Sequence, residues 1–142
     1  YGAAKAAMVG FMNVLHHEGA KNNIRVNTLA PTAATRMLEG LIPPQVADLM
    51  APELVTPGVL YLVSEDAPSK TILGAGAGCF SVVHIYETPA VFVGGANATV
   101  DDVAANWAKI SNPANEQPID AAFAQTNKFV AAAAEALGVK LG

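Results

Sequence analysis

Apolar residues recur at helical spacing in the first part of the chain. They occupy positions i, i+4, i+7 and i+11, which predicts an amphipathic helix over residues 2–19. These positions are Ala4, Met8, Phe11 and Leu15. Gly19 falls where a helix commonly ends in a left-handed residue. Branched and polar residues then alternate from Ile24 to Ala30, and this pattern predicts a β-strand that stops at Pro31.

Shorter elements follow, marked by turn and capping residues. A Pro-Pro pair interrupts residues 38–50, so this segment is predicted to form two short helical pieces. Thr56 followed by Pro57 is typical of an N-cap with proline at the first helical position, and predicts a helix over residues 58–64. Residues 72–86 are strand-like but interrupted by glycines.

The last third of the chain predicts two more helices. Thr99 and Asp102 have the spacing of a capping box, which predicts a helix that continues through Ile110. Pro118 is predicted to open a final alanine-rich helix, and Gly138 to end it.

The first residues also carry candidate chemistry, because Tyr1 and Lys5 are separated by one helical turn. Residues i and i+4 of a helix lie on the same face. An ammonium group there would stabilise the phenolate form of a tyrosine, so the pair could act as an acid–base catalyst. The plain alternative is a tyrosine and a lysine on a solvated helix face, and the spacing alone does not decide between the two.

Composition narrows the classes of function. The chain has 142 residues, of which 52% are hydrophobic and 14% charged, and this is apolar for a small independent domain. A net charge of −4 argues against nucleic-acid binding, which requires a basic surface. The single cysteine, Cys79, excludes an internal disulfide and indicates a reducing compartment, so we expect a cytoplasmic protein. No apolar run approaches the roughly 18 residues of a membrane span, so no membrane partner is expected.

Two suggestive motifs do not support a ligand. The glycines between Gly74 and Gly78 lack the spacing of a dinucleotide loop, and close backbone packing in a strand explains them better. His16 and His17 are adjacent, so on a helix they point about 100° apart and cannot chelate one metal ion. His84 stands alone in a strand. We therefore predict no metal site.

Beyond these patterns, the order of motifs resembles a known family. Residues 1–31, from Tyr-Gly-Ala-Ala-Lys to Asn-Ile-Arg-Val-Asn-Thr-Leu-Ala-Pro, are similar to the active-site helix and following strand of short-chain dehydrogenases/reductases. Residues 23–37 and 50–57 look like one branch of that family, the dehydrogenase domain of peroxisomal multifunctional enzyme type 2 and its bacterial relatives. The similarity continues more loosely through residues 74–78 and 103–110.

The resemblance implies a role for each candidate site residue. Tyr1 would be the general acid–base, and Lys5 would assist it while binding the ribose hydroxyls of the nicotinamide cofactor. The turn after the strand would contact the nicotinamide amide, which implies cofactor-binding roles for Pro31, Thr32, Ala34 and Thr35. The family usually has glycine where this chain has Thr32, so the cofactor-binding role implied by the resemblance has the weakest support at this position. The turn could also be an ordinary polar turn.

For the fold, the resemblance implies an α/β protein: the C-terminal half of a Rossmann-like doubly wound parallel sheet with an extra helical C-terminal extension. Residues 1–86 would form the half-domain. Residues 87–142 would form the extension, which would pack against a partner subunit or domain. Residues 38–50 resemble the substrate lid of the family, and their apolar side chains would suit either an acyl substrate or ordinary packing.

For function, the resemblance implies an oxidoreductase that transfers a hydride between NAD or NADP, with NAD favoured, and a secondary alcohol or ketone. The substrate could be a 3-hydroxyacyl-CoA. The glycine-rich loop, the catalytic Ser and Asn and the rest of the N-terminal half are expected outside these residues, so the chain alone should be inactive. A homodimer is expected. A non-catalytic interaction or dimerisation segment is the alternative.

Overall fold

The computed structural model describes residues 1–119 and 121–142. Within them the chain forms two compact units, Tyr1–Val83 and His84–Gly142. The expected assignment of a half-domain to residues 1–86 and of an extension to residues 87–142 stays a prediction.

The first unit is built on a mixed three-stranded sheet with strand order β1-β2-β3. Strand β1 (Thr28–Thr32) pairs in parallel with β2 (Ile72–Gly76), and β2 pairs antiparallel with β3 (Cys79–Val83). The turn between β2 and β3 is only two residues long, and both, Ala77 and Gly78, have positive φ angles. Such turns match the twist of a hairpin. The glycine-interrupted segment is therefore a hairpin rather than one strand.

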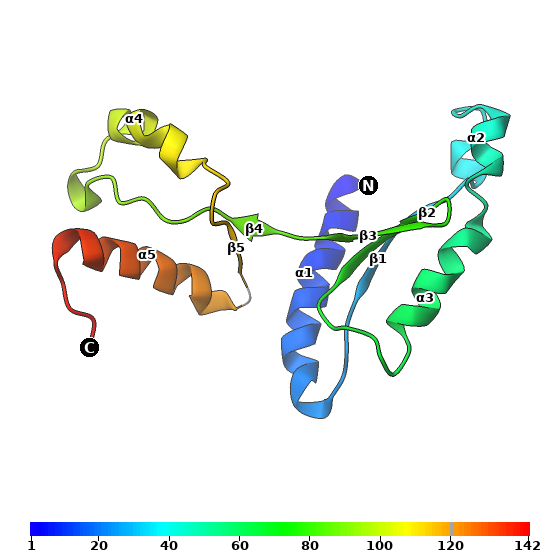
Figure 1. Ribbon diagram of the computed structural model, residues 1–142, viewed down its shortest axis with the longest axis horizontal. Helices are drawn as coiled ribbons and strands as arrows, with labels where there is room; N and C mark the ends of the chain where they lie inside the picture. The colour runs from blue at the N-terminus through cyan, green and yellow to red at the C-terminus, as the bar shows by residue number, and fades with distance from the viewer. Residues whose placement is uncertain (120) are drawn as a thin grey trace. The chain divides into compact units, whose positions relative to one another are not determined.

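Two helices lie on opposite sides of this sheet (Figure 1). Helix α1 (Gly2–Gly19) contacts β1, while α3 (Thr56–Leu62) packs closely where Gly58 meets the sheet. A Cβ atom on Gly58 would lie 2.9 Å from the Phe80 ring and 3.1 Å from Leu73 Cδ2. Most of the buried apolar side chains of the described residues are in this unit: Met12, Val55, Ala67, Leu73 and Ala75.

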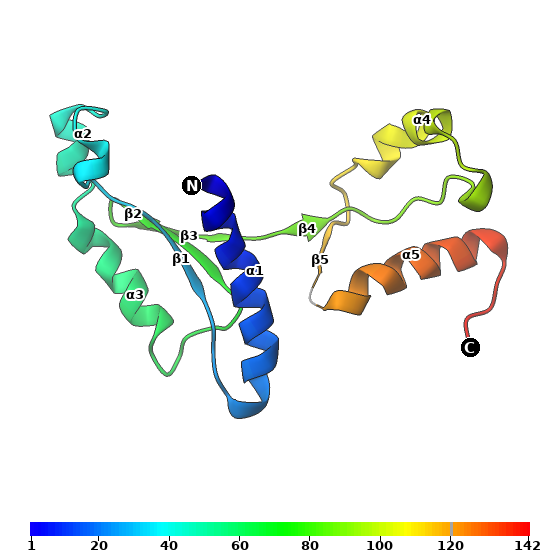
Figure 2. The same cartoon turned by 180° about the vertical axis from the view of Figure 1, so that it is seen from behind.

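Between β1 and α3 the chain forms short helical pieces. They are the 3-10 turn η2 (Arg36–Leu38), helix α2 (Pro44–Asp48) and the 3-10 turn η3 (Pro52–Val55). Only one of them, α2, lies inside residues 38–50, where two were predicted. Figure 2 shows α2 beyond the carboxyl end of the sheet. Helix α3 begins at Thr56 instead of after it, and the Thr56 side chain makes no capping hydrogen bond.

The strand predicted to stop at Pro31 is displaced along the chain. It spans Thr28–Thr32, with Pro31 opposite Ala75 inside the paired region. The amide of Thr28 donates to the carbonyl of Thr71, so alternate residues of β1 face β2 and the nitrogen of Pro31 faces the other way. Because β1 is an edge strand among the described residues, the missing N–H costs no hydrogen bond within this sheet.

The predicted end of α1 was correct, but its left-handed residue was assigned wrongly. The chain continues from Gly19 into the 3-10 turn η1 (Ala20–Asn22), and Asn23 takes the left-handed conformation with φ 55°. Gly19 serves close packing instead, since a Cβ atom there would lie 2.9 Å from Ile24 Cβ. Asparagine tolerates the left-handed region better than most residues, which explains its use here.

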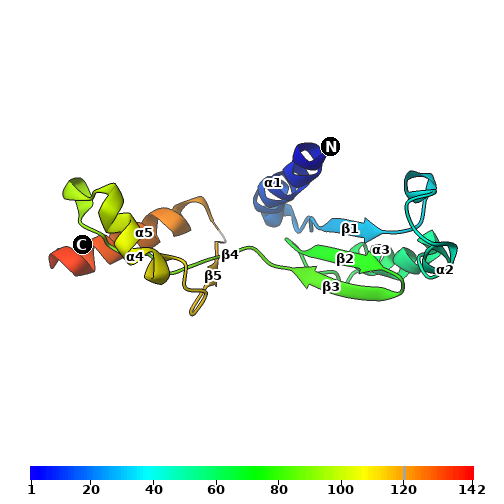
Figure 3. The ribbon, with the colours of Figure 1, turned by 90° about the horizontal axis from the view of Figure 1, so that it is seen from above.

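The second unit contains two helices and a short two-stranded sheet (Figure 3). Strand β4 (Tyr86–Glu87) pairs antiparallel with β5 (Gln117–Pro118). The 3-10 turn η4 (Gly95–Asn97) leads to helix α4 (Val100–Ile110), which begins with the predicted capping box of Thr99 and Asp102. Hydrogen bonds from the Thr99 side chain and amide lower the pKa of Asp102.

The final helix does not open at Pro118. Pro118 belongs to β5, and helix α5 is Ala122–Leu137, ended as predicted by Gly138 in the left-handed conformation. Part of the predicted start, Asp120, lies outside the described residues. Pro118 pairs with Tyr86 in a ladder of two residues, so strand pairing overrides the local tendency of proline to begin a helix.

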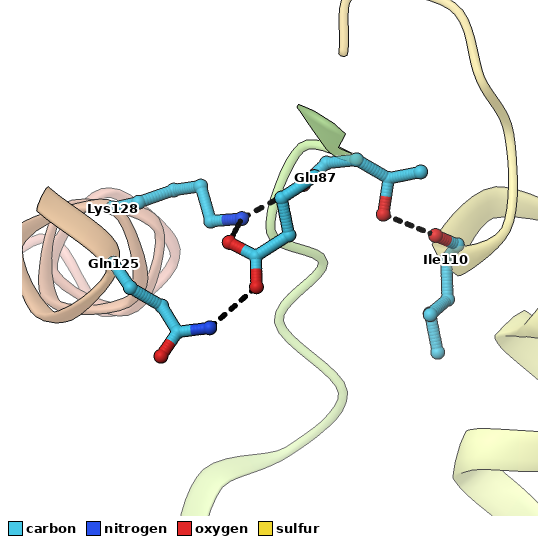
Figure 4. A network of polar contacts seen from close by, with 5 residues as sticks. Glu87, Ile110, Gln125 and Lys128 are labelled. Atoms are coloured by element: carbon cyan, nitrogen blue, oxygen red, sulfur yellow. Dashed lines mark hydrogen bonds and ion pairs between the residues drawn. The ribbon is translucent and has the colours of Figure 1, made fainter. Parts of the chain in front are cut away.

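Polar contacts join α5 and α4 to the segment around β4 (Figure 4). The Lys128 ammonium donates to the Glu87 carboxylate and, at 2.9 Å, to the Thr88 carbonyl, while the Gln125 amide also donates to Glu87. The Thr88 hydroxyl donates to the Ile110 carbonyl at 2.7 Å. We call these contacts the Glu87 network. The hydrogen bond from Lys128, followed by that from Gln125, lowers the pKa of Glu87.

Candidate active site

Tyr1 and Lys5 lie on the same face at the start of α1. Tyr1 is the N-cap residue, and the Lys5 amide donates to its carbonyl at 3.0 Å. The Lys5 ammonium lies 5.5 Å from the centre of the Tyr1 ring, which is within range of a cation–π contact. The Tyr1 side chain is 86% exposed and Lys5 is also exposed. The spacing thus brings the two groups together in a solvated position.

The N-terminal end of α1 lies at the end of the sheet from which the chain leaves β1 (Figure 1). This follows from the connection, because α1 runs away from its first turn, reverses through η1, and returns as β1. The first turn of α1 and the segment after β1 are therefore at the carboxyl end of the parallel strands. In open α/β sheets this end collects ligands.

The segment after β1 holds the other predicted residues. Pro31 and Thr32 are the last residues of β1, and both are exposed. The Ala34 amide donates to the Met50 carbonyl at 2.7 Å, which ties this segment to the residue before η3. The Thr35 hydroxyl accepts from the Met37 amide at 3.4 Å and caps η2. Thr35 is therefore held in place by its own turn.

Two shallow cavities open in this region. The first, about 360 Å³, is lined by sheet residues that include Thr32, Gly74, Gly76 and Ser81. The second, about 440 Å³, is lined by Ala34, Thr35 and the residues around η2 and α2. Of the predicted residues, Thr32 lines the first cavity and Ala34 and Thr35 line the second, whereas Tyr1 and Lys5 line neither of these two.

Close backbone packing shapes the first cavity, as the glycine pattern predicted. A Cβ atom on Gly76 would lie 2.7 Å from the Thr32 carbonyl oxygen, and one on Gly74 would lie 2.8 Å from Ser81 Oγ. Both distances are shorter than an ordinary contact, but Ser81 Oγ can rotate away whereas the Thr32 carbonyl cannot, so Gly76 is the position that needs glycine. Gly76 in particular fixes how near β2 comes to the end of β1.

Sequence reasoning missed the contacts that hold the opposite end of β1. The Asn27 side chain donates to the Pro68 carbonyl at 2.7 Å and accepts from the Thr71 amide at 3.1 Å. The Arg25 guanidinium donates to the Glu65 and Ala67 carbonyls. Ser69 Oγ lies 2.8 Å from His16 Nδ1. Only the run of polar residues before β1 hinted at this role, because partners about 40 residues away leave no local signal.

In the part of the chain that the structure describes, no group of three or more His, Cys, Asp or Glu side chains is arranged to hold a metal ion. No described helix is both long and apolar enough to cross a bilayer.

Comparison with known proteins shows which family the chain resembles. Residues 1–44 match the family model described as short chain dehydrogenase. A short-chain type dehydrogenase/reductase from Mycobacterium tuberculosis is 43% identical over 117 residues, which are 79% of this chain and 39% of that protein. The chain is similar to members of the short-chain dehydrogenase/reductase family, as the sequence motifs predicted.

Within the family the similarity reaches the multifunctional-enzyme branch. Peroxisomal multifunctional enzyme A from Dictyostelium discoideum is 36% identical over 79% of this chain and 25% of that protein. Peroxisomal multifunctional enzyme type 2 from mouse is 36% identical over 81% of this chain and 16% of that protein. The predicted resemblance to this branch is confirmed. The chain spans well under half the length of these relatives.

A solved structure supports the fold. Full-length peroxisomal multifunctional enzyme type 2 from Drosophila melanogaster superposes with a TM-score of 0.79 over 96% of this chain and 25% of that chain, at 23% identity. This likeness shows an α/β fold in which a sheet with parallel strands is covered by helices.

Proposed function

We propose that these residues form the C-terminal half of a Rossmann-like domain in an NAD(P)-dependent oxidoreductase. The reaction is hydride transfer between nicotinamide and a secondary alcohol or ketone, with a 3-hydroxyacyl-CoA as substrate. The glycine-rich loop and the catalytic Ser would come from sequence outside these 142 residues. The names of two kinds of relative support this proposal: a short-chain type dehydrogenase/reductase supports an oxidoreductase, and the acetoacetyl-CoA reductases support a CoA thioester as substrate. The cytoplasmic location stays a prediction, and several relatives carry a peroxisomal name.

The observation that carries this proposal is the Tyr1–Lys5 pair at the carboxyl end of β1. Lys5 Nζ lies near the Tyr1 ring, so its charge would stabilise the phenolate that takes the proton from the alcohol and becomes the phenol. In the reverse direction the phenol would return that proton to the ketone oxygen. Both groups are exposed, so further sequence would have to exclude water around them.

The groups on the chain fit a nicotinamide nucleoside chemically. A ribose and a carboxamide each need donors and acceptors, and Lys5, Thr32 and Thr35 with the nearby backbone supply both kinds. When bound, the cofactor would supply the hydride acceptor or donor. The role of the chain would be to orient it through Lys5 and the segment Pro31, Thr32, Ala34 and Thr35, and to move the proton through Tyr1.

The alternative is a non-catalytic interaction or dimerisation segment, in keeping with the proposed homodimer. The exposed apolar residues of α4 and α5, such as Trp107 and Phe123, favour it. The upstream reading frame separates the two functions. A glycine-rich strand–helix turn and a serine about one helix length before Tyr1 would favour the enzyme, and their absence would favour the segment.

The decisive experiment is hydride transfer by the full-length protein with Tyr1→Phe. We expect at least a hundredfold loss of kcat, because general acid–base catalysis contributes about 10²–10⁴-fold, while cofactor binding stays largely intact. Tyr61→Phe is the matched control, since Tyr61 is an exposed tyrosine on α3 and should keep full activity. Normal turnover by Tyr1→Phe would contradict the assignment.

Lys5→Met should lower activity and weaken cofactor binding together, whereas Lys21→Met, on η1, should change neither. Titration of the full-length protein with NADH and NADPH, followed by nicotinamide fluorescence, would decide the cofactor. We expect tighter binding of NADH by resemblance.

A further inference from the structure

Arg36 is an exposed cation at the rim of the second cavity. It begins η2, directly after Thr35, and it is one of the residues that line this cavity of about 440 Å³. Within the part of the chain that the structure describes, its guanidinium makes no hydrogen bond or ion pair. Arg25, the other arginine, by contrast donates from Nη1 to two backbone carbonyls. Arg36 is thus free to bind a ligand.

The wall of the cavity beside Arg36 is mainly apolar. Leu38, Ile42 and Ala47 are half-buried there, and Pro44 closes the side formed by α2. The opposing charge on the rim is Glu39, which is exposed and forms no ion pair with Arg36. A ligand that fits must therefore carry an apolar arm for the wall and an anionic group for the guanidinium.

A dinucleotide fits this surface less well than a thioester carrier does. A dinucleotide diphosphate is best bound by several backbone amides at a helix N-terminus, and η2 is a single turn whose Met37 amide already donates to Thr35. The acyl-phosphopantetheine arm of coenzyme A is long, carries apolar acyl and dimethyl groups beside its two amides and its hydroxyl, and ends in phosphates. Guanidinium groups bind phosphate oxygens through paired hydrogen bonds.

We propose that Arg36 binds a phosphate of the coenzyme A moiety of the substrate, while the wall of Leu38, Ile42 and Ala47 contacts its pantetheine arm. Arg36 is then a specificity-determining residue that distinguishes CoA thioesters from thioesters without phosphate. This inference rests on the proposed hydroxyacyl-CoA substrate. It adds a recognition site separate from the acid–base pair.

The test compares two thioesters in the full-length protein. One is a 3-hydroxyacyl-CoA, and the other is the same acyl group on N-acetylcysteamine, which keeps the thioester but has no phosphate. Arg36→Gln should raise KM for the CoA thioester about five- to tenfold, in line with the loss of one exposed charge-assisted contact. The KM for the N-acetylcysteamine thioester and both kcat values should stay within about twofold.

Three variants serve as controls. Arg36→Lys should recover part of the lost affinity, because it keeps the charge but not the paired geometry. Glu39→Gln should lower the KM for the CoA thioester, because it removes the repelling charge from the same rim. Lys21→Gln, an exposed cation on η1, should leave both KM values unchanged. Equal rises in KM for both thioesters, or a rise in KM for the dinucleotide, would overturn the role given to Arg36.

Binding of free coenzyme A, measured by calorimetry without turnover, separates this inference from the proposed function. If the wild-type protein oxidises neither thioester but binds coenzyme A through Arg36, the proposed reaction is wrong and the recognition role stands. If the protein is an active dehydrogenase whose binding of coenzyme A is the same in Arg36→Gln, the recognition role is wrong and the reaction stands.

Discussion

The units Tyr1–Val83 and His84–Gly142 are stabilised by different means. Among the described residues, five of the six buried apolar side chains belong to the first unit, and only Ala134 belongs to the second. The first unit also has the longer strand pairings and the closest backbone contacts. The second depends on the capping box of α4 and on the Glu87 network.

This difference indicates which changes should most affect the stability of each unit. Apolar burial is the dominant favourable term in folding and does not depend on protonation. Hydrogen bonds to exposed carboxylates contribute less, and they vary with pH and salt. The first unit should therefore respond most to changes in core volume. The second should respond most to changes in charge and in capping.

The largest effect should come from Leu73→Ala in β2. Leu73 is 9% exposed and packs near Gly58 of α3, so truncation should leave a cavity and destabilise the first unit by about 2–4 kcal/mol. The matched change in the second unit is Trp107→Ala, which removes more atoms. Because Trp107 is 60% exposed, it should cost under about 0.5 kcal/mol. Hydrogen exchange of the amides in β2 and α4, measured at increasing urea concentration, would give the loss of unfolding free energy for each variant. Equal losses for the two variants would contradict the proposed difference between the units.

Gly76→Ala should have the next largest effect. Its new Cβ would lie 2.7 Å from a backbone oxygen of Thr32, which cannot rotate away, so we expect a loss of about 1–3 kcal/mol. Gly10→Ala is the control, because it lies inside α1 with nothing within 4 Å of the added atom and should stabilise the helix by about 0.5–1 kcal/mol. Thermal melting would show shifts of opposite sign. A destabilised Gly10→Ala would mean that α1 is not the regular helix described.

A medium effect is expected at the helix caps. Thr99→Ala removes the hydroxyl that accepts from the Asp102 amide, and should cost about 1 kcal/mol in α4. Thr56→Ala in the first unit should cost less, because Thr56 makes no capping hydrogen bond. Amide exchange in the first turns of α4 and α3 would compare the two. A larger loss in α3 would show that capping is not the feature that distinguishes the units.

The smallest effect should be the response to acid. The Lys128 contact holds the pKa of Glu87 below its usual 4.5 in the folded chain, so the contact contributes in full above that value and is lost as the pH falls through the folded pKa. Melting of α5 should therefore shift to lower temperature between about pH 5 and pH 3. Glu87→Gln should abolish most of that shift, whereas Glu116→Gln should keep it. An unchanged shift in Glu87→Gln would exclude the Glu87 network as its cause.

Local patterns predicted the limits of α1 and α4 well, but they misplaced the start of α5 and the limits of the strands. The spacing of apolar residues placed α1 correctly, and the capping box placed α4 at its true bounds. These signals act within one or two helical turns, so they can be read from neighbouring residues. Strand limits depend on partners far along the chain. The pairing of Pro31 with Ala75 and of Pro118 with Tyr86 overrode the tendency of each proline to end or begin an element.

The sequence motif identified the residues of the candidate site, but it did not predict the tertiary contacts among them. The spacing of Tyr1 and Lys5 correctly placed both groups on one face, because that is a property of a single helix. Nothing local to Ala34 indicated that its amide would be joined to Met50, 16 residues later, or that Arg36 would border a cavity with α2. Those relations arise from tertiary packing. The roles of the site residues stay predictions until the proposed variants are measured.

The direction of the Pro31 nitrogen has one more consequence. On the outer side of β1, Leu29 can offer a hydrogen-bond donor to an added strand, but Pro31 cannot. A strand added along that side would accept a backbone hydrogen bond from Leu29, near the beginning of β1, but none from Pro31. The two strands could then separate at the carboxyl end of β1, which is the end of the sheet near Tyr1 and Lys5. This separation would leave space between the two strands for a planar ring.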